Sequence, residues 1–146
     1  MTEVAFHFNV PDKVHYLCRL LRKVTGTGKR ALVLLPDSTL HDLDSALWTF
    51  SQPDFISHAT VSDAPSLRSR SAVLLATQSC DAGHHDVLIN TLPDVPGGFE
   101  GFDKVLEIVG LEPDDRSHAR ARWKLYAQQG YAVQQYDVAQ IQKANA

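Results

Sequence analysis

The sequence predicts an α/β fold of three layers, in which helices cover both faces of a mostly parallel sheet. Segments with the two-residue period of a strand alternate along the chain with segments that have the period of an amphipathic helix. Residues 31–35 (ALVLL) are apolar at every position, which is typical of a strand covered on both faces. Alternation of this kind implies crossovers between parallel strands. A chain of 146 residues can bury a core without disulfides or metals, so residues 1–146 are predicted to form one α/β domain.

The first part of the chain predicts two pairs of a strand and a helix. Residues 4–8 (VAFHF) alternate apolar and polar side chains as a strand does, and a helical pattern begins after Pro11. This helix ends at the glycines of the segment 26–29 (GTGK). After the second strand, either Asp37 or Ser38 can cap a second helix. The inward-facing positions are Val14, Leu17, Leu21 and Val24 in the first helix and Leu40, Leu43 and Leu47 in the second.

The middle of the chain predicts four further strands. Three of them fall at 56–61, 72–77 and 87–92, and polar loops separate them. Residues 105–109 (VLEIV) fit either a helical stripe or a strand. Their β-branched side chains and the glycines that flank them favour the strand.

A basic helix is predicted within residues 116–131 (RSHARARWKLYAQQGY), which hold four basic and three aromatic side chains and no acidic one. Two stripes would run along this helix. The charged row consists of Arg116, Arg120 and Lys124, and the apolar stripe consists of Ala119, Trp123 and Tyr126. A cationic surface beside an aromatic one suits a carboxylate-rich peptide or a phosphate. An ordinary solvated helix face would have the same spacing.

The segments on either side of this helix carry less information. Glu112, Asp114 and Asp115 lie near its start, where the helix macrodipole favours negative charge. The tail from Ala132 onward is polar, and its last ten residues are expected to be poorly ordered.

Composition excludes several classes of protein. No apolar run approaches the ~20 residues of a membrane-spanning helix, and the N-terminal residues lack the pattern of a signal peptide. The sequence therefore predicts a cytoplasmic protein without a membrane partner. Cys18 and Cys80 are too few for a disulfide framework and are expected to be inert thiols. The net charge of −3 argues against broad electrostatic binding to nucleic acid.

No catalytic, cofactor or metal site is predicted. The GTGK segment superficially matches a phosphate loop, but such a loop follows a strand and opens a helix, whereas this one ends a helix. Arg30 also stands where a phosphate loop has Ser or Thr. His84 and His85 are adjacent loop histidines without a second His or Cys pair at metal-ligand spacing. The chain is accordingly predicted not to be an enzyme.

Three segments together resemble one protein family. They are 46–59 (ALWTFSQPDFISHA), 86–96 (DVLINTLPDVP) and 120–131 (RARWKLYAQQGY). The family is the chi subunit of bacterial DNA polymerase III holoenzyme, an accessory protein of the clamp loader, and the similarity extends from the first strand to about Tyr131. The resemblance implies a topology like that of mononucleotide-binding proteins without their phosphate loop, no cofactor, and a place at replication forks on the nucleoid.

The resemblance also implies an adaptor with two partners and only indirect contact with DNA. One partner is single-stranded DNA-binding protein, whose acidic C-terminal tail ends in Pro-Phe, and the other is the psi subunit of the clamp loader. The positions implied for the tail are Arg116, Arg120, Trp123, Lys124 and Val109, and those implied for psi are Trp48 and Phe55. For Trp48, core packing beside the leucine stripe is equally compatible with the sequence.

Two alternatives of other classes compete with the adaptor. A direct nucleic-acid-binding protein would use its basic helix against phosphates, and its affinity would fall steeply with salt. The residues for this purpose would be Arg116, Arg120, Arg122 and Lys124. A nucleotide-dependent enzyme would need a phosphate site, which the sequence does not provide. The acidic net charge and the confinement of the basic row to one helix favour a small acidic peptide as the ligand.

Overall fold

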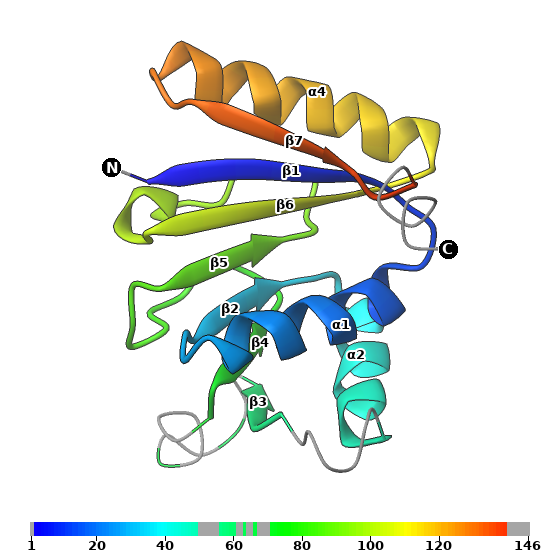
Figure 1. Ribbon diagram of the computed structural model, residues 1–146, viewed down its shortest axis with the longest axis vertical. Helices are drawn as coiled ribbons and strands as arrows, with labels where there is room; N and C mark the ends of the chain where they lie inside the picture. The colour runs from blue at the N-terminus through cyan, green and yellow to red at the C-terminus, as the bar shows by residue number, and fades with distance from the viewer. Residues whose placement is uncertain (1, 50–55, 61–62, 64–65, 67–70, 140–146) are drawn as a thin grey trace.

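The computed structural model of the protein describes residues 2–49, 56–60, 63, 66 and 71–139. These residues form an open sheet of seven strands in the order β3-β4-β2-β5-β6-β1-β7, and every neighbouring pair is parallel (Figure 1). The strands are β1 (Glu3–Val10), β2 (Ala31–Leu34), β3 (His58–Thr60), β4 (Val73–Ala76), β5 (Val87–Asn90), β6 (Lys104–Gly110) and β7 (Val133–Asp137). The predicted parallel α/β fold is confirmed.

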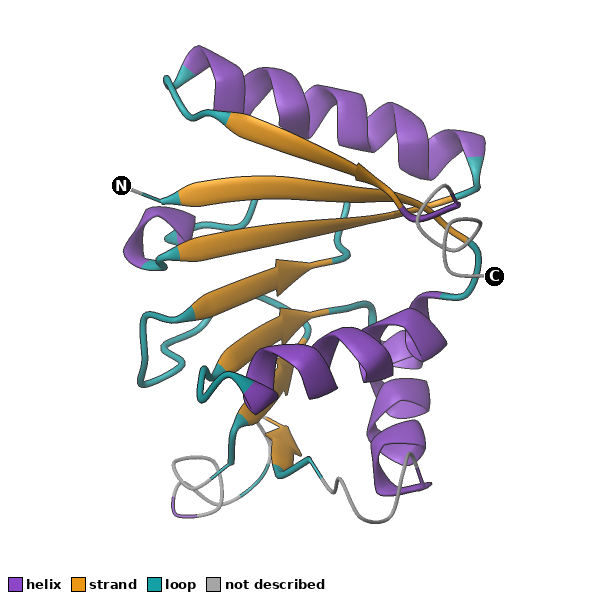
Figure 2. Cartoon of the chain, in the orientation of Figure 1, coloured by secondary structure: helices purple, strands orange, loops and turns teal. Residues whose placement is uncertain are grey.

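Helices cover the two faces of the sheet at different ends. The helices are α1 (Lys13–Gly26), α2 (Asp37–Thr49) and α4 (Pro113–Gln128), with a short 3-10 turn, η2 (Phe99–Gly101), before β6. Figure 2 shows α1 and α2 beside the β2 and β4 end of the sheet and α4 beside the β6, β1 and β7 end. Among the described α-helices, α4 is the one whose buried residues pack on this face, together with Phe99 of η2, so its inward side chains largely determine how that end of the sheet is covered.

Two apolar clusters fill the spaces between the layers. Under α1 and α2 the cluster includes Leu17, Leu21, Leu43, Leu47 and Ile89, and under α4 it includes Phe6, Leu88, Val105, Ala119 and Tyr126. The helical spacings predicted for both early helices place their leucines in the first cluster, as expected. Burial of an aliphatic side chain stabilises the fold by roughly 1.5–3 kcal/mol. The strand prediction for residues 105–109 is also confirmed, since β6 covers them.

One part of the fold departs from the sequence prediction. The polar tail contains β7, which pairs in parallel with β1 and forms one edge of the sheet. Its side chains are mostly exposed, so the sequence VQQYD lacks the apolar alternation that marks a half-buried strand. The strand extends to Asp137 and the next residue, Val138, is buried, whereas residues 140–146 lie outside the described residues.

The GTGK segment joins a helix to a strand, as predicted from the sequence. α1 ends at Gly26 and β2 begins at Ala31, so the order of elements is the reverse of that in a phosphate loop. Gly28 has a φ of 83°, a left-handed conformation that glycine adopts at little cost. These glycines therefore serve a turn, and the topology has no phosphate loop at this position.

Candidate functional site

A pocket of about 510 Å³ lies between α4 and the strands β1, β6 and β7. Its lining falls into an apolar and a polar group. The apolar group is Phe6, Phe8, Val109, Ala119 and Trp123, and the polar group is Asn9, Arg116, Arg120, Lys124 and Gln135. All five residues that the resemblance assigned to the tail thus line one pocket. Four lining residues were not predicted as site residues, namely Asn9, Phe6, Phe8 and Gln135, which come from β1 and β7.

The apolar floor of the pocket consists of side chains from alternate positions of β1 and β6 and from one face of α4. In β1 and β6, every second side chain points toward α4, which brings Phe6 and Val109 under the helix. Trp123 is half-buried, and its ring lies 5.2 Å from the ring of Phe6, centroid to centroid, at an interplanar angle of 45°. The ring of Tyr126 also packs against Phe6, at 6.0 Å between centroids in an edge-on arrangement. The Trp123 ring is therefore held in place from the core side while it lines the pocket.

The charged row predicted for the helix lies at the rim of this pocket. Arg116, Arg120 and Lys124 are all exposed and follow one another at four-residue spacing in α4. Among the described residues, none of the three forms an ion pair within 4.0 Å. Three positive charges that have no carboxylate partner among the described residues, beside an apolar slot, would suit an anion that also carries an apolar group.

Arg122 does not belong to the charged row. Its side chain is 1% exposed, and its Nε donates a hydrogen bond of 2.9 Å to Glu107 Oε1. Its Nη1 also donates to the carbonyl oxygen of Pro93 at 3.1 Å. The proposal that Arg122 contacts phosphates is therefore wrong, because the residue occurs two positions after Arg120 and so lies on the helix face that meets the sheet.

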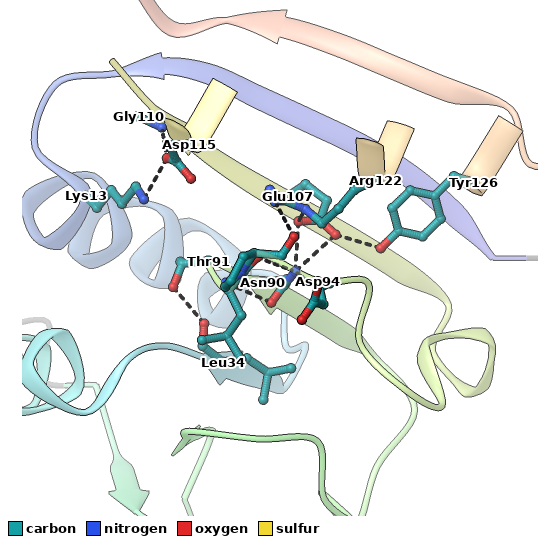
Figure 3. A network of polar contacts seen from close by, with 12 residues as sticks. Lys13, Leu34, Asn90, Thr91, Asp94, Glu107, Gly110, Asp115, Arg122 and Tyr126 are labelled. Atoms are coloured by element: carbon teal, nitrogen blue, oxygen red, sulfur yellow. Dashed lines mark hydrogen bonds and ion pairs between the residues drawn. The ribbon is translucent and has the colours of Figure 1, made fainter. Parts of the chain in front are cut away.

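Glu107 is the centre of a buried polar network. Figure 3 shows Arg122 and Tyr126 of α4 and Asn90 of β5 converging on its carboxylate. The Tyr126 hydroxyl donates to Oε2 at 2.6 Å, and Asn90 Nδ2 donates to Oε1 and Oε2 at 3.0 and 3.2 Å. Burial raises the pKa of Glu107, while the Arg122 guanidinium and these hydrogen bonds oppose the rise. Because the network joins α4 to two strands, it fixes the rotation of α4 and hence the direction in which the charged row points.

A second polar contact anchors the start of α4. The Asp115 carboxylate accepts a hydrogen bond of 2.6 Å from the Gly110 amide and lies 2.8 Å from Lys13 Nζ. Burial tends to raise the pKa of Asp115, but these two contacts outweigh it, so the pKa is lowered. The acids at the helix start were predicted to stabilise it through their negative charge. Asp115 also connects α4 to the end of β6 and to α1.

Of the two residues assigned to psi, the structure describes Trp48, which lies at the other end of the sheet from this pocket. Trp48 is 57% exposed at the end of α2, and its ring meets the ring of His58 edge-on at 5.0 Å. His58 Nε2 lies 3.1 Å from Asp44 Oδ1. His58 belongs to β3, the edge strand opposite β7. The core-packing alternative for Trp48 is therefore wrong, while Phe55 lies outside the described residues.

A larger hollow of about 1150 Å³ lies on the other face of β1, beside α1. Its lining mixes both signs of charge. The cations are Arg19, Lys23, Lys29 and Lys104, and the carboxylates are Glu3, Asp86 and Asp103. The three carboxylates offset three of the four cations, so the hollow carries much less positive charge than its cations alone would give it. In its wall, His7 Nδ1 is hydrogen-bonded to the Tyr16 hydroxyl, and the ring of His7 lies 5.2 Å from that of Tyr136.

Protonation of His7 is expected to destabilise the fold in acid. Burial, followed by the charges of Lys104 and Lys23, lowers the pKa of His7 from 6.5 to about 4. Since the unfolded chain takes up this proton more readily, the contribution of neutral His7 is complete above pH 6.5 and is lost as the pH falls toward 4. Urea unfolding of the wild type and of His7→Gln across this range checks the effect. The wild type should lose stability relative to the variant in acid, and parallel curves would contradict the assignment.

The other sequence candidates have structural contacts. His84 Nδ1 accepts a hydrogen bond from the Asp86 amide, and His85 Nδ1 donates to the Gly101 carbonyl oxygen. In the part of the chain that the structure describes, no group of three metal-ligating side chains comes together. Cys18 is buried, which raises the pKa of its thiol to about 11. Over the same residues, none of the helices has the length and apolar character that crossing a bilayer requires.

Comparison with solved structures shows which proteins share the fold. A structure of the C-terminal domain of the DEAD-box protein Dbp5 matches with a TM-score of 0.60 and 13% identity, covering 95% of this chain and 91% of that one. S. cerevisiae Dbp5 bound to RNA and ADP BeF3 matches with a TM-score of 0.63 and 12% identity, and this chain spans 43% of its length. At such low identity the likeness shows the fold alone.

Comparison of sequences shows the family to which the chain belongs. Residues 1–134 match the family model described as DNA polymerase III chi subunit, HolC. DNA polymerase III subunit chi of Pseudomonas aeruginosa is 29% identical over 147 residues, which is 97% of this chain and 100% of that protein. The corresponding subunit of Escherichia coli is 26% identical over 117 residues, 79% of this chain and 78% of that protein. Because the family model matches nearly the whole chain, this protein belongs to the DNA polymerase III chi subunit family.

Proposed function

We propose that the chain is a non-catalytic adaptor that binds the C-terminal tail of single-stranded DNA-binding protein through the pocket under α4 and the clamp loader through psi. Membership of the chi family makes the chain an accessory subunit of DNA polymerase III. The adaptor would act in the cytoplasm, at replication forks on the nucleoid, and would reach DNA only through its partner.

The observation that carries the proposal is the chemistry of the pocket. An acidic peptide that ends in Phe offers several carboxylates and one large apolar group. The rim cations Arg116, Arg120 and Lys124 provide donors for the carboxylates. The slot between Val109 and Trp123 provides apolar contact for the terminal ring. Because both features lie on one side of a single helix, a short peptide can reach them together.

Direct binding of nucleic acid by α4 has less support. The burial of Arg122 leaves three cations on this face instead of four. The slot beside them is apolar at its floor, which suits a side chain better than an extended phosphate backbone. With a net charge of −3, the whole chain also repels polyanions.

Calorimetric titration with a synthetic tail peptide tests the proposal. The peptide is expected to bind with micromolar affinity, and the same peptide without its terminal Phe is expected not to bind, because the apolar slot would stay empty. Equal binding of both peptides, or of neither, would contradict the proposed site. A bare oligonucleotide that binds with a steep salt dependence, when neither peptide binds, would instead support the nucleic-acid alternative.

Removal of the Trp48 ring is expected to weaken the psi contact alone. An exposed Trp beside the opposite edge of the sheet is the type of residue that dominates binding energy at interfaces. Trp48→Ala should weaken association with psi about tenfold, or ~1.4 kcal/mol, and leave the affinity for the tail peptide unchanged. Biolayer interferometry with immobilised psi provides the measurement, with Arg120→Ala as the control that should retain psi. Unchanged psi binding by Trp48→Ala would remove this residue from the interface.

A further inference from the structure

We infer that Asn9 is a positioning residue of the pocket, which holds the Arg116 guanidinium at the rim and leaves its charge available to a carboxylate of the bound peptide. The inference rests on the proposed function and extends it to a residue of β1. Asn9 lines the same pocket as Arg116 but carries no charge of its own.

The backbone of Asn9 has an unusual conformation. Its φ is 62°, and it is the only residue other than glycine with a positive φ in the described part of the chain. The conformation falls at a break in the pairing of β1 with β6, where His7 pairs with Ile108 but Val10 pairs with Gly110. One extra residue therefore stands in β1, as in a β-bulge, and such bulges redirect a side chain. Asparagine tolerates this left-handed region better than most residues.

The bulge places the Asn9 amide between two charged side chains. Arg116 Nη2 donates a hydrogen bond of 2.7 Å to Asn9 Oδ1, and Asn9 Nδ2 donates one of 3.0 Å to Asp137 Oδ1. Asp137 Oδ1 also accepts from the Ala139 amide at 3.0 Å, so the carboxylate is held in turn. An amide has one accepting and one donating end, and only one orientation satisfies both neighbours. The side chain of Arg116 is thus oriented by a chain of contacts that reaches β7.

The amide also keeps two opposite charges apart. A direct pair between Arg116 and Asp137 would neutralise the guanidinium, whereas the intervening amide orients it without adding a negative charge at the rim. A glycine would adopt the positive φ at lower cost than asparagine. The presence of a side chain that is strained at this position, and that reaches the rim, points to a role for the amide beyond the turn.

Three variants distinguish the effect of the Asn9 amide on peptide binding from the effect of the Asn9 backbone conformation. Asn9→Gly keeps the left-handed conformation and removes the amide, so it should weaken binding of the tail peptide about fivefold. Asn9→Asp places a carboxylate beside Arg116, which would compete with the carboxylates of the peptide, so a loss of about twentyfold is expected. In an Arg116→Ala background, Asn9→Gly should have no further effect, because the group it positions is absent. Calorimetry provides the affinities, and thermal melting verifies that each variant is folded.

The outcomes distinguish the inference from the function on which it rests. If the wild type binds the peptide and Arg116→Ala weakens binding, but neither Asn9 variant does, the inference is overturned and the function stands. An equal effect of Asn9→Gly with and without Arg116 would also overturn it, because the amide would then act through the fold alone. If the wild type does not bind the peptide at all, the proposed function and the inference both fail.

Discussion

Replacing Glu107 with alanine is expected to lower the free energy of unfolding by about 3–5 kcal/mol. The substitution leaves the Arg122 guanidinium buried, 1% exposed, without its carboxylate partner. It also removes the acceptor of the Tyr126 hydroxyl and one partner of the Asn90 amide. The penalty arises mainly from the uncompensated buried charge, which costs more than the ion pair contributes when both partners are present.

Urea unfolding of the variant measures this loss, and a double variant provides the control. Glu107→Leu combined with Arg122→Met removes both charges and keeps similar volume, so it should recover most of the stability. A loss below ~1 kcal/mol in Glu107→Ala would mean that water reaches Arg122. In that case the network would not be the anchor that fixes the rotation of α4.

Replacing Arg120 with alanine is expected to weaken the tail contact by about 1.5–3 kcal/mol, the range for a hydrogen bond to a charged group. Arg120 stands at the centre of the charged row, is exposed, and has no ion pair among the described residues. Its loss should therefore leave the fold intact and lower the affinity about 10- to 150-fold.

Arg19→Ala is the matched control, because Arg19 is also an exposed helical arginine but lines the hollow on the other face of β1. The control should change the affinity for the peptide by less than about twofold, since a charge on the far side is screened by salt. Calorimetry on both variants distinguishes a local contact from the general effect of one lost charge. If the two variants lost equal affinity, or neither did, Arg120 would not lie in the peptide site.

The fold could be predicted from the sequence because its strands and helices have strong local patterns. The run ALVLL marks β2, and the leucines of α1 and α2 recur at helical spacing. The edge strand β7 lacked such a signal, because an edge strand with exposed side chains does not need apolar alternation. Its pairing with β1 depends on contacts between residues more than a hundred positions apart, which no local pattern records.

The helix side of the pocket could be predicted from the spacing of its residues, whereas on the strands only Val109 was anticipated, through the family resemblance. The spacing of Arg116, Arg120 and Lys124 indicated the charged row. Asn9, however, comes from a bulge in a strand, and the two-residue alternation of strand side chains does not predict bulges. One feature of the sequence could have indicated that Arg122 is buried. This feature is the acid in the middle of the apolar run VLEIV. An acid within a buried strand needs a cation or hydrogen-bond donors nearby.

The most direct test of the peptide site uses the two tryptophans of the chain, one on each proposed surface. Trp123 lines the pocket under α4, and Trp48 is exposed beside the opposite edge of the sheet. Titration of the ¹⁵N-labelled protein with the tail peptide, observed by the indole N–H signals, should shift the signal of Trp123 and leave that of Trp48 in place. A shift of Trp48 alone, or no shift of either signal at saturating peptide, would contradict the assignment of the tail to this pocket.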